Sequence, residues 1–442
     1  MAPLPQESLF GALEVPPYDE VFALMAAFAA DSSPQKVSLG AGVYRDDDAK
    51  SWRLNIIKKV EKLLWEDSSF DHEYLPIPGY QPFVDAAREL IFGTNSPVPK
   101  CRIASLQTIS GTGANHIGAR FLKDHLPRLS PSSASSSSSA TPARKIWLSD
   151  PTWANHHLIW DLVGTSSTGS PLKIAVYPYY HAPTRSFDFE GMVQNLEANA
   201  QKGDIILLHA CAHNPTGLDP TRAQWQEIAA LCQRKGIFPF FDSAYQGFAS
   251  GDLDNDAWAI REFASRGMEL CVAQSFSKNL GLYGQRVGAF HLVCHTEDAA
   301  RRAWSQMVEL QRGEFSTPPS YGARVAAAVI CDPAYISEWK QDLAVMSGRI
   351  KAMRHALYDE LRRLRTPGTW EHIINQIGMF SYTGLTKEQI KTLRDDYHIY
   401  MLESGRASIS GLNTKNVKYV ASAFDAVVRG TPSSSTSNGH GH

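Results

Sequence analysis

Short apolar runs alternate with helical patterns along most of the chain, and each run ends in a cluster of polar residues. In DIILLHACAHNPTG the run 204–210 predicts a buried strand followed by a loop. The next stretch opens with a capping box from Thr221 to Gln224, carries one apolar face and stops at Gly236, so it predicts a helix. The run 237–241 predicts another buried strand. This βαβ unit implies an α/β fold with parallel strands between layers of helices.

Two further apolar runs, KIWLSDPTW and LCVAQSFSK, fit the same scheme. Open α/β sheets bind ligands at the carboxyl ends of their strands, so we expect these polar clusters to meet in one crevice. The pattern then changes: SEWKQDLAVMSGRIKAMRHALYDELRRL predicts one long amphipathic helix, followed by short strands around GMFSYTGL and HIYMLESGRASIS. The change predicts a second, smaller α+β domain.

Composition narrows the class of protein. The chain has 442 residues and a formal net charge of −2, so it lacks the broad basic field of a nucleic-acid-binding protein. No apolar run reaches the roughly 18 to 20 residues of a membrane span, and the start has neither the basic nor the apolar part of a signal peptide. The six cysteines are far apart and show no metal-ligand spacing. These features predict a reduced, cytoplasmic protein with no metal, membrane or nucleic-acid partner.

The stretch QTISGTGAN is a Gly-rich turn that leads into a helical pattern. Exposed N–H groups at such a turn can hold a phosphate through Ser110, Gly111 and Thr112. The alternative is a plain loop in which the glycines only provide positive φ angles. The stretch lacks the GK[ST] ending of a P-loop, which argues against a nucleoside triphosphate.

Three more residues at strand ends have both a functional and a purely structural interpretation. Asp242 follows four apolar residues in FPFFD and needs a cationic partner such as a protonated ring nitrogen, unless it only caps a turn. Trp153 could stack on a flat ring or belong to the core. Asn214 precedes a proline and could form only an Asx turn. The sequence favours neither His156 nor His209 as the main base.

The most informative residue is Lys278, at the end of VAQSFSK. No carboxylate is close to it in sequence, and burial of an unpaired ammonium lowers its pKa and makes the neutral amine available as a nucleophile and base. Arg286 is a second cation nearby, and two cations beside a Ser-rich turn favour a dianion such as a phosphate monoester. Pyridoxal 5′-phosphate matches all these groups, with an aldehyde for Lys278, a ring nitrogen for Asp242, a ring face for Trp153 and a phosphate.

Nine motifs make the chain resemble the aspartate aminotransferases, which are class I pyridoxal-phosphate enzymes of fold type I. The motifs are SLGAGVYRDD, HEYLPIPGY, SGTGA, DPTWANH, HACAHNPTG, FFDSAYQGFASG, SFSKNLGLYGQRVG, GMFSYTG and ESGRASISGL. The resemblance implies a large domain with a mixed, mostly parallel seven-stranded sheet between helices, and a smaller α+β domain. It divides the chain into an arm (1–18), a small domain in two parts (19–52 and 336–430), a cofactor-binding domain (53–335, with a Ser-rich insertion at 130–143) and a disordered tail (431–442).

The resemblance also implies the roles of the residues around the cofactor. Lys278 is similar to the lysine that forms the Schiff base and moves the proton between Cα and C4′, Asp242 to the partner of the ring nitrogen, and His156 to its support. Asn214 and Tyr245 would bind the 3′ oxygen, and Trp153 would stack on the ring. The phosphate would be held by Ser110, Gly111, Thr112, Ser275 and Arg286, joined by Tyr74 of a second subunit.

For the substrate, the resemblance implies transfer of the amino group of L-aspartate to 2-oxoglutarate, giving oxaloacetate and L-glutamate by a ping-pong mechanism through pyridoxamine phosphate. Arg406 would bind the α-carboxylate, with Gly42, Asn214 and Trp153 nearby. Arg312 would reach across a homodimer with shared active sites to the side-chain carboxylate of a dicarboxylic amino or keto acid.

One stretch departs from the family pattern R-x-x-W-S-N-P-P. Here it reads RGEFSTPP, with Phe315 for Trp, Thr317 for Asn, and Glu314 as an alternative partner for Arg312; Ala41 also replaces a usual Val. A first alternative function is therefore the same cofactor with another substrate or reaction: an aromatic amino acid, cysteine sulfinate or an elimination. A second is a non-catalytic nucleotide-binding α/β protein that uses SGTGANHIG as its loop, in which Lys278 would be dispensable.

Overall fold

The structure is a computed structural model that describes residues 8–16, 18–68, 70–127, 143–165 and 171–430. The predicted tail and nearly all of the predicted Ser-rich insertion lie outside these ranges. Within the described residues, no helix is both long enough and apolar enough to cross a membrane.

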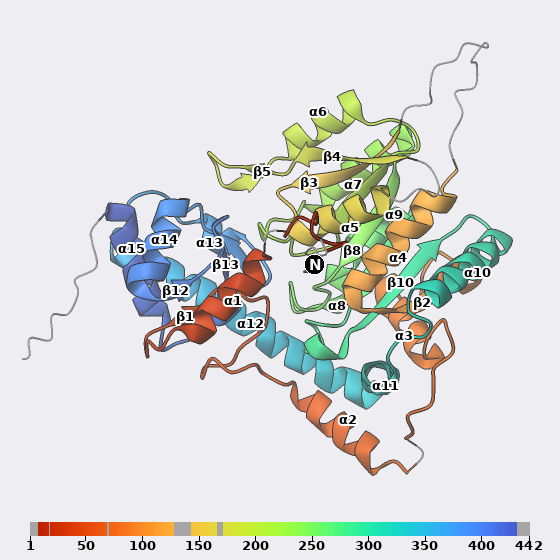
Figure 1. The fold of residues 1–442 in the computed structure, drawn as a ribbon, viewed down its shortest axis with the longest axis horizontal. Coiled ribbons are helices and arrows are strands. Elements are labelled where there is room, and N and C mark those ends of the chain that lie inside the picture. The colour runs from red at the N-terminus through yellow and green to blue at the C-terminus, as the bar shows by residue number, and fades with distance from the viewer. Residues whose placement is uncertain (1–7, 17, 69, 128–142, 166–170, 431–442) are drawn as a thin grey trace, which may run out of the picture.

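A seven-stranded sheet forms the centre of the larger part of the molecule (Figure 1). Its strands, in spatial order, are β2 (Ile103–Ile109), β10 (Val287–Val293), β9 (Leu270–Ser275), β8 (Phe238–Ser243), β7 (Ile205–His209), β3 (Arg144–Asp150) and β4 (Leu172–Pro178). Only β10 runs antiparallel to its neighbours in this sheet. The predicted mixed, mostly parallel sheet is confirmed, and the predicted βαβ unit is β7, α7 and β8.

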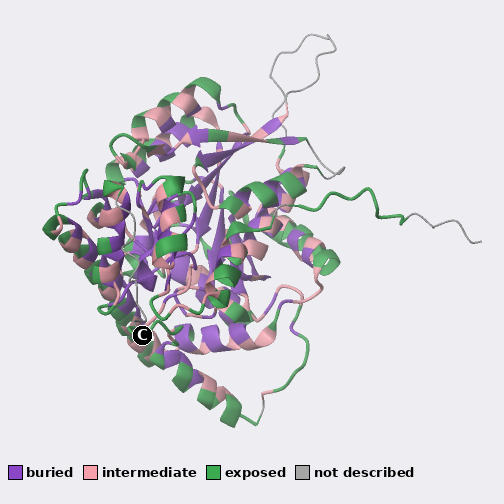
Figure 2. Cartoon of the chain, turned by 60° about the vertical axis from the view of Figure 1, so that its left-hand side comes forward, coloured by how far each residue is buried: buried purple, intermediate pink, exposed green. Residues whose placement is uncertain are grey.

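Helices cover both faces of this sheet, as expected for strands that are apolar on both sides. One apolar cluster joins the sheet to α4 (Ser110–His125), α5 (Ala154–Gly164) and α10 (Glu297–Glu314). Another joins it to α3 (Gln81–Phe92), α6 (Phe189–Asn199), α7 (Arg222–Lys235) and α9 (Trp258–Ser265). The buried strands between these layers form the interior that Figure 2 shows in purple.

Local sequence explains two features that position the site. Helix α7 has the predicted capping box between Thr221 and Gln224 and ends at Gly236 in the left-handed conformation. Helix α4 approaches the sheet closely at Gly118, where an added Cβ would lie 2.5 Å from the Phe290 ring and 2.6 Å from the Phe240 ring. A side chain there would push α4, whose first turn faces the site, away from the strands.

The smaller part of the molecule lies beside this sheet, at the left of Figure 1, and combines an early segment of the described chain with its last segments. It contains α1 (Glu20–Ala30), α13 (His372–Asn375), α14 (Lys387–Tyr397) and α15 (Val417–Arg429), with the pairs β1 (Val37–Ser38) with β12 (Ile399–Tyr400) and β11 (Phe380–Tyr382) with β13 (Arg406–Ser408). The predicted long helix is α12 (Pro333–Arg363), which packs on α2 (Asn55–Glu66) and α11 (Ser320–Cys331) near one end and on α15. The predicted division at 335/336 falls in its first turn, so one continuous helix joins the two parts.

The remaining elements are short and lie around this frame. They are α8 (Leu253–Asp256), the hairpin β5 (Tyr180–His181) and β6 (Ser186–Phe187), and the 3₁₀ turns at Lys100–Arg102, Tyr283–Gln285 and Ile409–Gly411.

The strand register brings polar residues together at one edge of the sheet. His209 at the end of β7 pairs with Asp242 on β8, and Ser275 at the end of β9 pairs with Gly288 on β10. The backbone N–H of Ser110, just after β2, donates to the carbonyl of Arg286, just before β10 (3.0 Å). The expected convergence at the carboxyl ends of the parallel strands is therefore present.

Candidate active site

A cavity of about 260 Å³ opens at this edge, between the strand ends and the smaller part of the molecule. Its walls hold most of the residues singled out in the sequence. Those are Gly42, Ser110, Gly111, Thr112, Trp153, Asn214, Asp242, Tyr245, Ser275, Lys278, Arg286 and Arg406.

Lys278 follows β9 and lies in the cavity wall, with its Nζ 5.3 Å from the centre of the Tyr245 ring. The surrounding protein withdraws its ammonium from water, which lowers its pKa. The positive charges of Arg286 and Arg406 act in the same direction, while Asp242 opposes them. The lowered pKa favours the neutral amine, the form that attacks a carbonyl carbon or accepts a proton.

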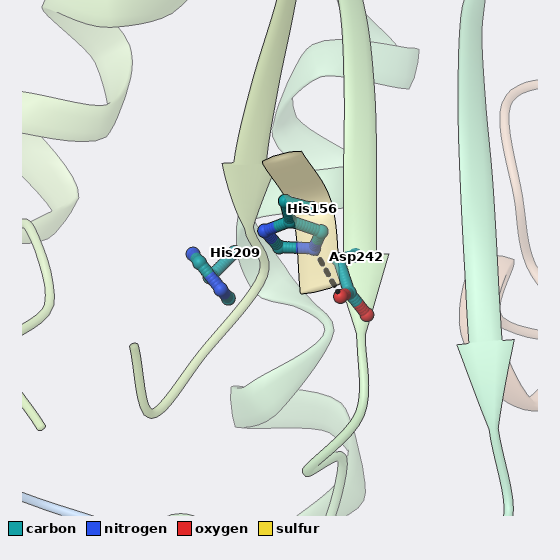
Figure 3. A group of neighbouring side chains, drawn as sticks. All are labelled: His156, His209 and Asp242. Atoms are coloured by element: carbon teal, nitrogen blue, oxygen red, sulfur yellow. Dashed lines mark hydrogen bonds and ion pairs between the residues drawn. The ribbon is translucent and has the colours of Figure 1, made fainter. Parts of the chain in front are cut away.

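Asp242, near the end of β8, is buried and accepts a hydrogen bond from His156 Nε2 on α5 (2.9 Å; Figure 3). The other nitrogen of His156 lies 2.9 Å from Thr152 Oγ1. Burial alone would raise the pKa of Asp242, but the hydrogen bond and charge of His156, with His209 and Lys278 nearby, lower it overall. The carboxylate is thus kept ionised at the base of the cavity, where it can stabilise a protonated ring nitrogen.

His209 lies beside this pair, from the end of β7 (Figure 3). Burial lowers its pKa to about 3, so the imidazole is neutral, and neither of its ring nitrogens has a partner among the described residues. One atom each of His156, His209 and Asp242 lie within 4.8 Å of one another, a spacing that a metal ion could use. However, His156 Nε2 is already hydrogen-bonded to Asp242 Oδ2, and His156 Nδ1 lies 2.9 Å from Thr152 Oγ1.

The first turn of α4, a helix of 16 residues, lines one end of the cavity through Ser110, Gly111 and Thr112. The N-terminus of such a helix is suited to hold an anion. Ser110 has φ +64°, and an added Cβ on Gly111 would lie 2.8 Å from the Cβ of Ser275. The alternative, in which the glycines of this turn only provide positive φ angles, does not hold: Ser110 adopts that conformation, and Gly111 is needed for close approach to β9. Half-buried Arg286, also at positive φ, completes this end.

Arg406, on β13, lies at the opposite side and is buried. It donates to the backbone carbonyl of Gly40 (2.8 Å) and to Asn214 Oδ1 (3.3 Å), and its guanidinium lies 4.1 Å from the centre of the Phe380 ring. Among the described residues, none of its hydrogen-bond partners is a carboxylate. Gly42 keeps this wall open, because an added Cβ would lie 3.2 Å from the Phe380 ring. The Arg406 guanidinium is therefore placed to form two parallel hydrogen bonds with the carboxylate of a ligand.

The flat faces of the cavity come from Trp153 and Tyr245. Trp153 caps the start of α5 and packs edge-on to His156, at 5.1 Å between ring centres. Tyr245 is buried, and burial raises the pKa of its phenol, so it keeps its proton and can donate a hydrogen bond.

Two predicted residues lie outside the cavity of this subunit. Tyr74 is 85% exposed, and Arg312, at the end of α10, is exposed and donates to the hydroxyl of Ser316. Glu314, which the sequence offered as a partner for Arg312, instead pairs with His116 (2.9 Å).

The cavity also contains residues that the sequence did not single out as ligand-binding. They are Val21, Asn115, His209, Ala244, Ser277, Tyr283 and Phe380. A signal was available for His209, because a polar residue that ends a buried strand beside Asp242 must face the same edge. Val21 comes from α1, which precedes the first of the nine motifs, so no local pattern could have indicated it.

The wall residues fit pyridoxal 5′-phosphate. A helix N-terminus with Arg286 stands where a phosphate would be held, a buried ionised carboxylate where a pyridinium nitrogen would lie, and an amine of lowered pKa beside them. Gly111 leaves a space that a Cβ would fill. The cofactor would be held by the predicted set of residues, with Asn214 and Tyr245 at its oxygen substituent.

Comparisons with known proteins agree with this geometry. Residues 34–424 match the family model "Aminotransferase class I and II". The chain is 49% identical to L-tyrosine:2-oxoglutarate aminotransferase of Aspergillus ustus, over 95% of this chain and 78% of the relative. It superposes on aspartate aminotransferase from the cytoplasm of Saccharomyces cerevisiae with a TM-score of 0.87 and 42% identity, covering 95% and 98% of the two chains.

A third comparison bears on the cofactor. The aromatic-amino-acid aminotransferase from Burkholderia pseudomallei, solved covalently bound to pyridoxal phosphate, superposes with a TM-score of 0.87 and 37% identity, covering 96% of this chain and 100% of the other. The fold, the cavity and these matches agree that the chain belongs to the class I and II aminotransferase family, whose cofactor is pyridoxal 5′-phosphate.

Proposed function

We propose that this chain transfers the amino group of L-aspartate to 2-oxoglutarate, forming oxaloacetate and L-glutamate in a ping-pong reaction. The observation that carries the proposal is the meeting of Lys278, Asp242 and Arg406 in one cavity. The similarity to the yeast aspartate aminotransferase over almost the whole of both chains supports the choice of substrate. The yeast relative is named as a protein of the cytoplasm, and we propose the same compartment for this chain.

Each residue of the proposed site has a task that follows from its position. When bound, pyridoxal phosphate supplies an aldehyde and an electron-withdrawing ring. Asp242 holds a proton on the ring nitrogen, and its own ionisation is maintained by His156. Lys278 moves the proton at the substrate Cα as its neutral amine. Arg406 fixes the α-carboxylate, which sets the orientation of the Cα–H bond toward that amine.

The smaller part of the molecule covers one side of the site. Phe380 and Gly42 pack against each other over Arg406, and Val21 on α1 lines the same side. Excluding water strengthens the pairing between a guanidinium and a carboxylate, because the effective dielectric constant falls.

We propose further that the enzyme is a homodimer in which each subunit completes its partner's site with Tyr74 and Arg312. Both side chains are exposed and outside the cavity of their own subunit. The described part of the arm supports an intersubunit contact, because it leaves four large apolar side chains at least 72% exposed: Leu9, Phe10, Leu13 and Val15.

Hybrid dimers test the shared site. Lys278→Ala and Arg312→Ala proteins are each expected to be inactive with aspartate, but a mixture that has exchanged subunits contains one site with intact Lys278 and intact Arg312. Activity should then return, up to half of the wild-type activity for each hybrid dimer, because one of its two sites is intact. A mixture that gains no activity after verified exchange would contradict the shared site.

Aromatic amino acids are a second candidate class of donor. The 49% identity to the Aspergillus ustus tyrosine aminotransferase favours them. The altered stretch RGEFSTPP favours them as well, because it changes the surroundings of Arg312, the residue proposed to select dicarboxylates.

A panel of donors distinguishes the two candidates. The holoenzyme would be assayed with L-aspartate, L-tyrosine, L-phenylalanine and cysteine sulfinate, each with 2-oxoglutarate, while the keto acid products and any ammonia are measured. We expect kcat/KM to be highest for L-aspartate. A higher value for L-tyrosine would transfer the proposal to the aromatic class, and ammonia release would indicate elimination.

A further inference from the structure

A second, smaller cavity lies beside residues 376–378, the segment that leads into β11. It has a volume of about 130 Å³ and lies between α12, the segment before β11, and the loop after β8. Its polar lining consists of Ser347, Lys351, Arg354, His355 and Gln376. Its volume is half that of the active-site cavity, about 260 Å³, so the smaller cavity is suited to a small ion or molecule.

Arg354 is the unusual group in this cavity. It is 2% exposed and donates only to neutral acceptors, the backbone carbonyls of Ile373 (2.9 Å), Gly378 (2.9 Å) and Phe380. Its Nε is buried and has no hydrogen-bond partner among the described residues. Burial lowers the pKa of the guanidinium to about 9, which still leaves it charged at neutral pH. A buried charge without a counterion is costly, and an anion would relieve that cost.

Two further nitrogen-bearing side chains surround the same space. Lys351 and His355 are one helical turn apart on α12, and both are exposed at the rim. The Lys351 ammonium donates to the backbone carbonyl of Ser250 (2.9 Å), which is another neutral acceptor. None of the described residues that line the cavity is Asp or Glu.

We propose that this cavity binds a small oxyanion, such as inorganic phosphate or a short carboxylate. The oxyanion would be attracted by the positive charge of Arg354, which lines the cavity, and would lie within reach of Lys351 and His355. The location gives the site a connection to the substrate pocket, since Arg354 holds the carbonyl of Phe380, whose ring covers Arg406. The inference depends on the geometry of this cavity and not on the proposed amino donor.

The test measures phosphate binding to the holoenzyme, in which bound cofactor already fills the phosphate site at α4. Lys351→Glu places a carboxylate at the rim and is exposed, so the fold should tolerate it. The matched control is Lys340→Glu, which makes the same charge change at an exposed position of the same helix but outside this cavity. Calorimetric titration with inorganic phosphate, and separately with malonate, distinguishes the two sources of oxyanion.

We expect wild type and Lys340→Glu to bind with equal affinity, and Lys351→Glu to bind roughly tenfold more weakly, or worse. Crystals soaked in selenate should show an anomalous peak beside Arg354. Equal affinity in all three proteins, no binding of either anion, or a peak only beside Arg406 would overturn the proposal.

Discussion

Replacing Arg406 with lysine tests how the site holds its substrate. The arginine uses one Nη on Gly40 and the other on Asn214, so its fork is fixed before substrate arrives. A lysine keeps the charge but cannot form a forked pair with a carboxylate. The loss of one charge-assisted hydrogen bond amounts to about 1.5 to 3 kcal/mol. We therefore expect KM to rise about 10- to 150-fold.

The factor should be the same for every amino donor that the enzyme accepts, because every donor presents the same α-carboxylate to Arg406. Steady-state kinetics with L-aspartate and L-tyrosine would measure it, and thermal unfolding of both proteins would verify that the variant is folded. By contrast, Arg312→Ala should impair L-aspartate alone. The reasoning is refuted if Arg406→Lys leaves KM unchanged, or raises it for one donor only.

Three further changes follow from the same structure. Lys278→Ala should lower kcat by roughly 10²- to 10⁴-fold or more, as for loss of a proton-transfer group, with an unchanged unfolding midpoint; near-normal turnover would contradict its role. Gly288→Ala would place a Cβ 2.4 Å from the Ser110 backbone and should weaken cofactor binding at least about tenfold by fluorescence titration, whereas Gly284→Ala, with nothing within 4 Å, should not. Burial lowers the pKa of His291 to about 3, below its unfolded value, so its contribution to stability is complete above pH 6.5 and is lost as pH falls from 6.5 toward 3. His291→Gln should therefore reduce the drop in unfolding free energy between pH 7 and pH 5 by about 2 kcal/mol in urea titrations. An unchanged drop would show that folding does not lower the pKa of His291.

The parts of the fold that local patterns determine could be predicted. Continuous apolar runs such as 237–241 indicate buried strands, and the capping box at Thr221 together with Gly236 determines both ends of α7. The direction of β10 could not be predicted from its own residues. A buried antiparallel strand and a buried parallel strand have the same apolar pattern, and only the connection from β9 decides between them.

The candidate site shows the same division. Lys278 and Asp242 are conspicuous in sequence because a charge at the end of an apolar run needs a partner. The contribution of α1 through Val21 depends on how two distant segments pack, which no short motif encodes. Likewise, the positive φ belongs to Ser110 and not to its neighbouring glycines, and Gly111 is a glycine because the close contact with β9 excludes a side chain there.

The central claim is that the amine of Lys278, the carboxylate of Asp242 and the guanidinium of Arg406 together perform transamination of L-aspartate. A single-turnover experiment tests it most directly: the yellow holoenzyme is mixed with L-aspartate in the absence of any keto acid, and absorbance and products are followed together. We predict that the yellow absorption disappears, that one equivalent of oxaloacetate forms per subunit, and that 2-oxoglutarate restores the colour. Persistent yellow colour, or release of ammonia in place of a stored amino group, would contradict the account.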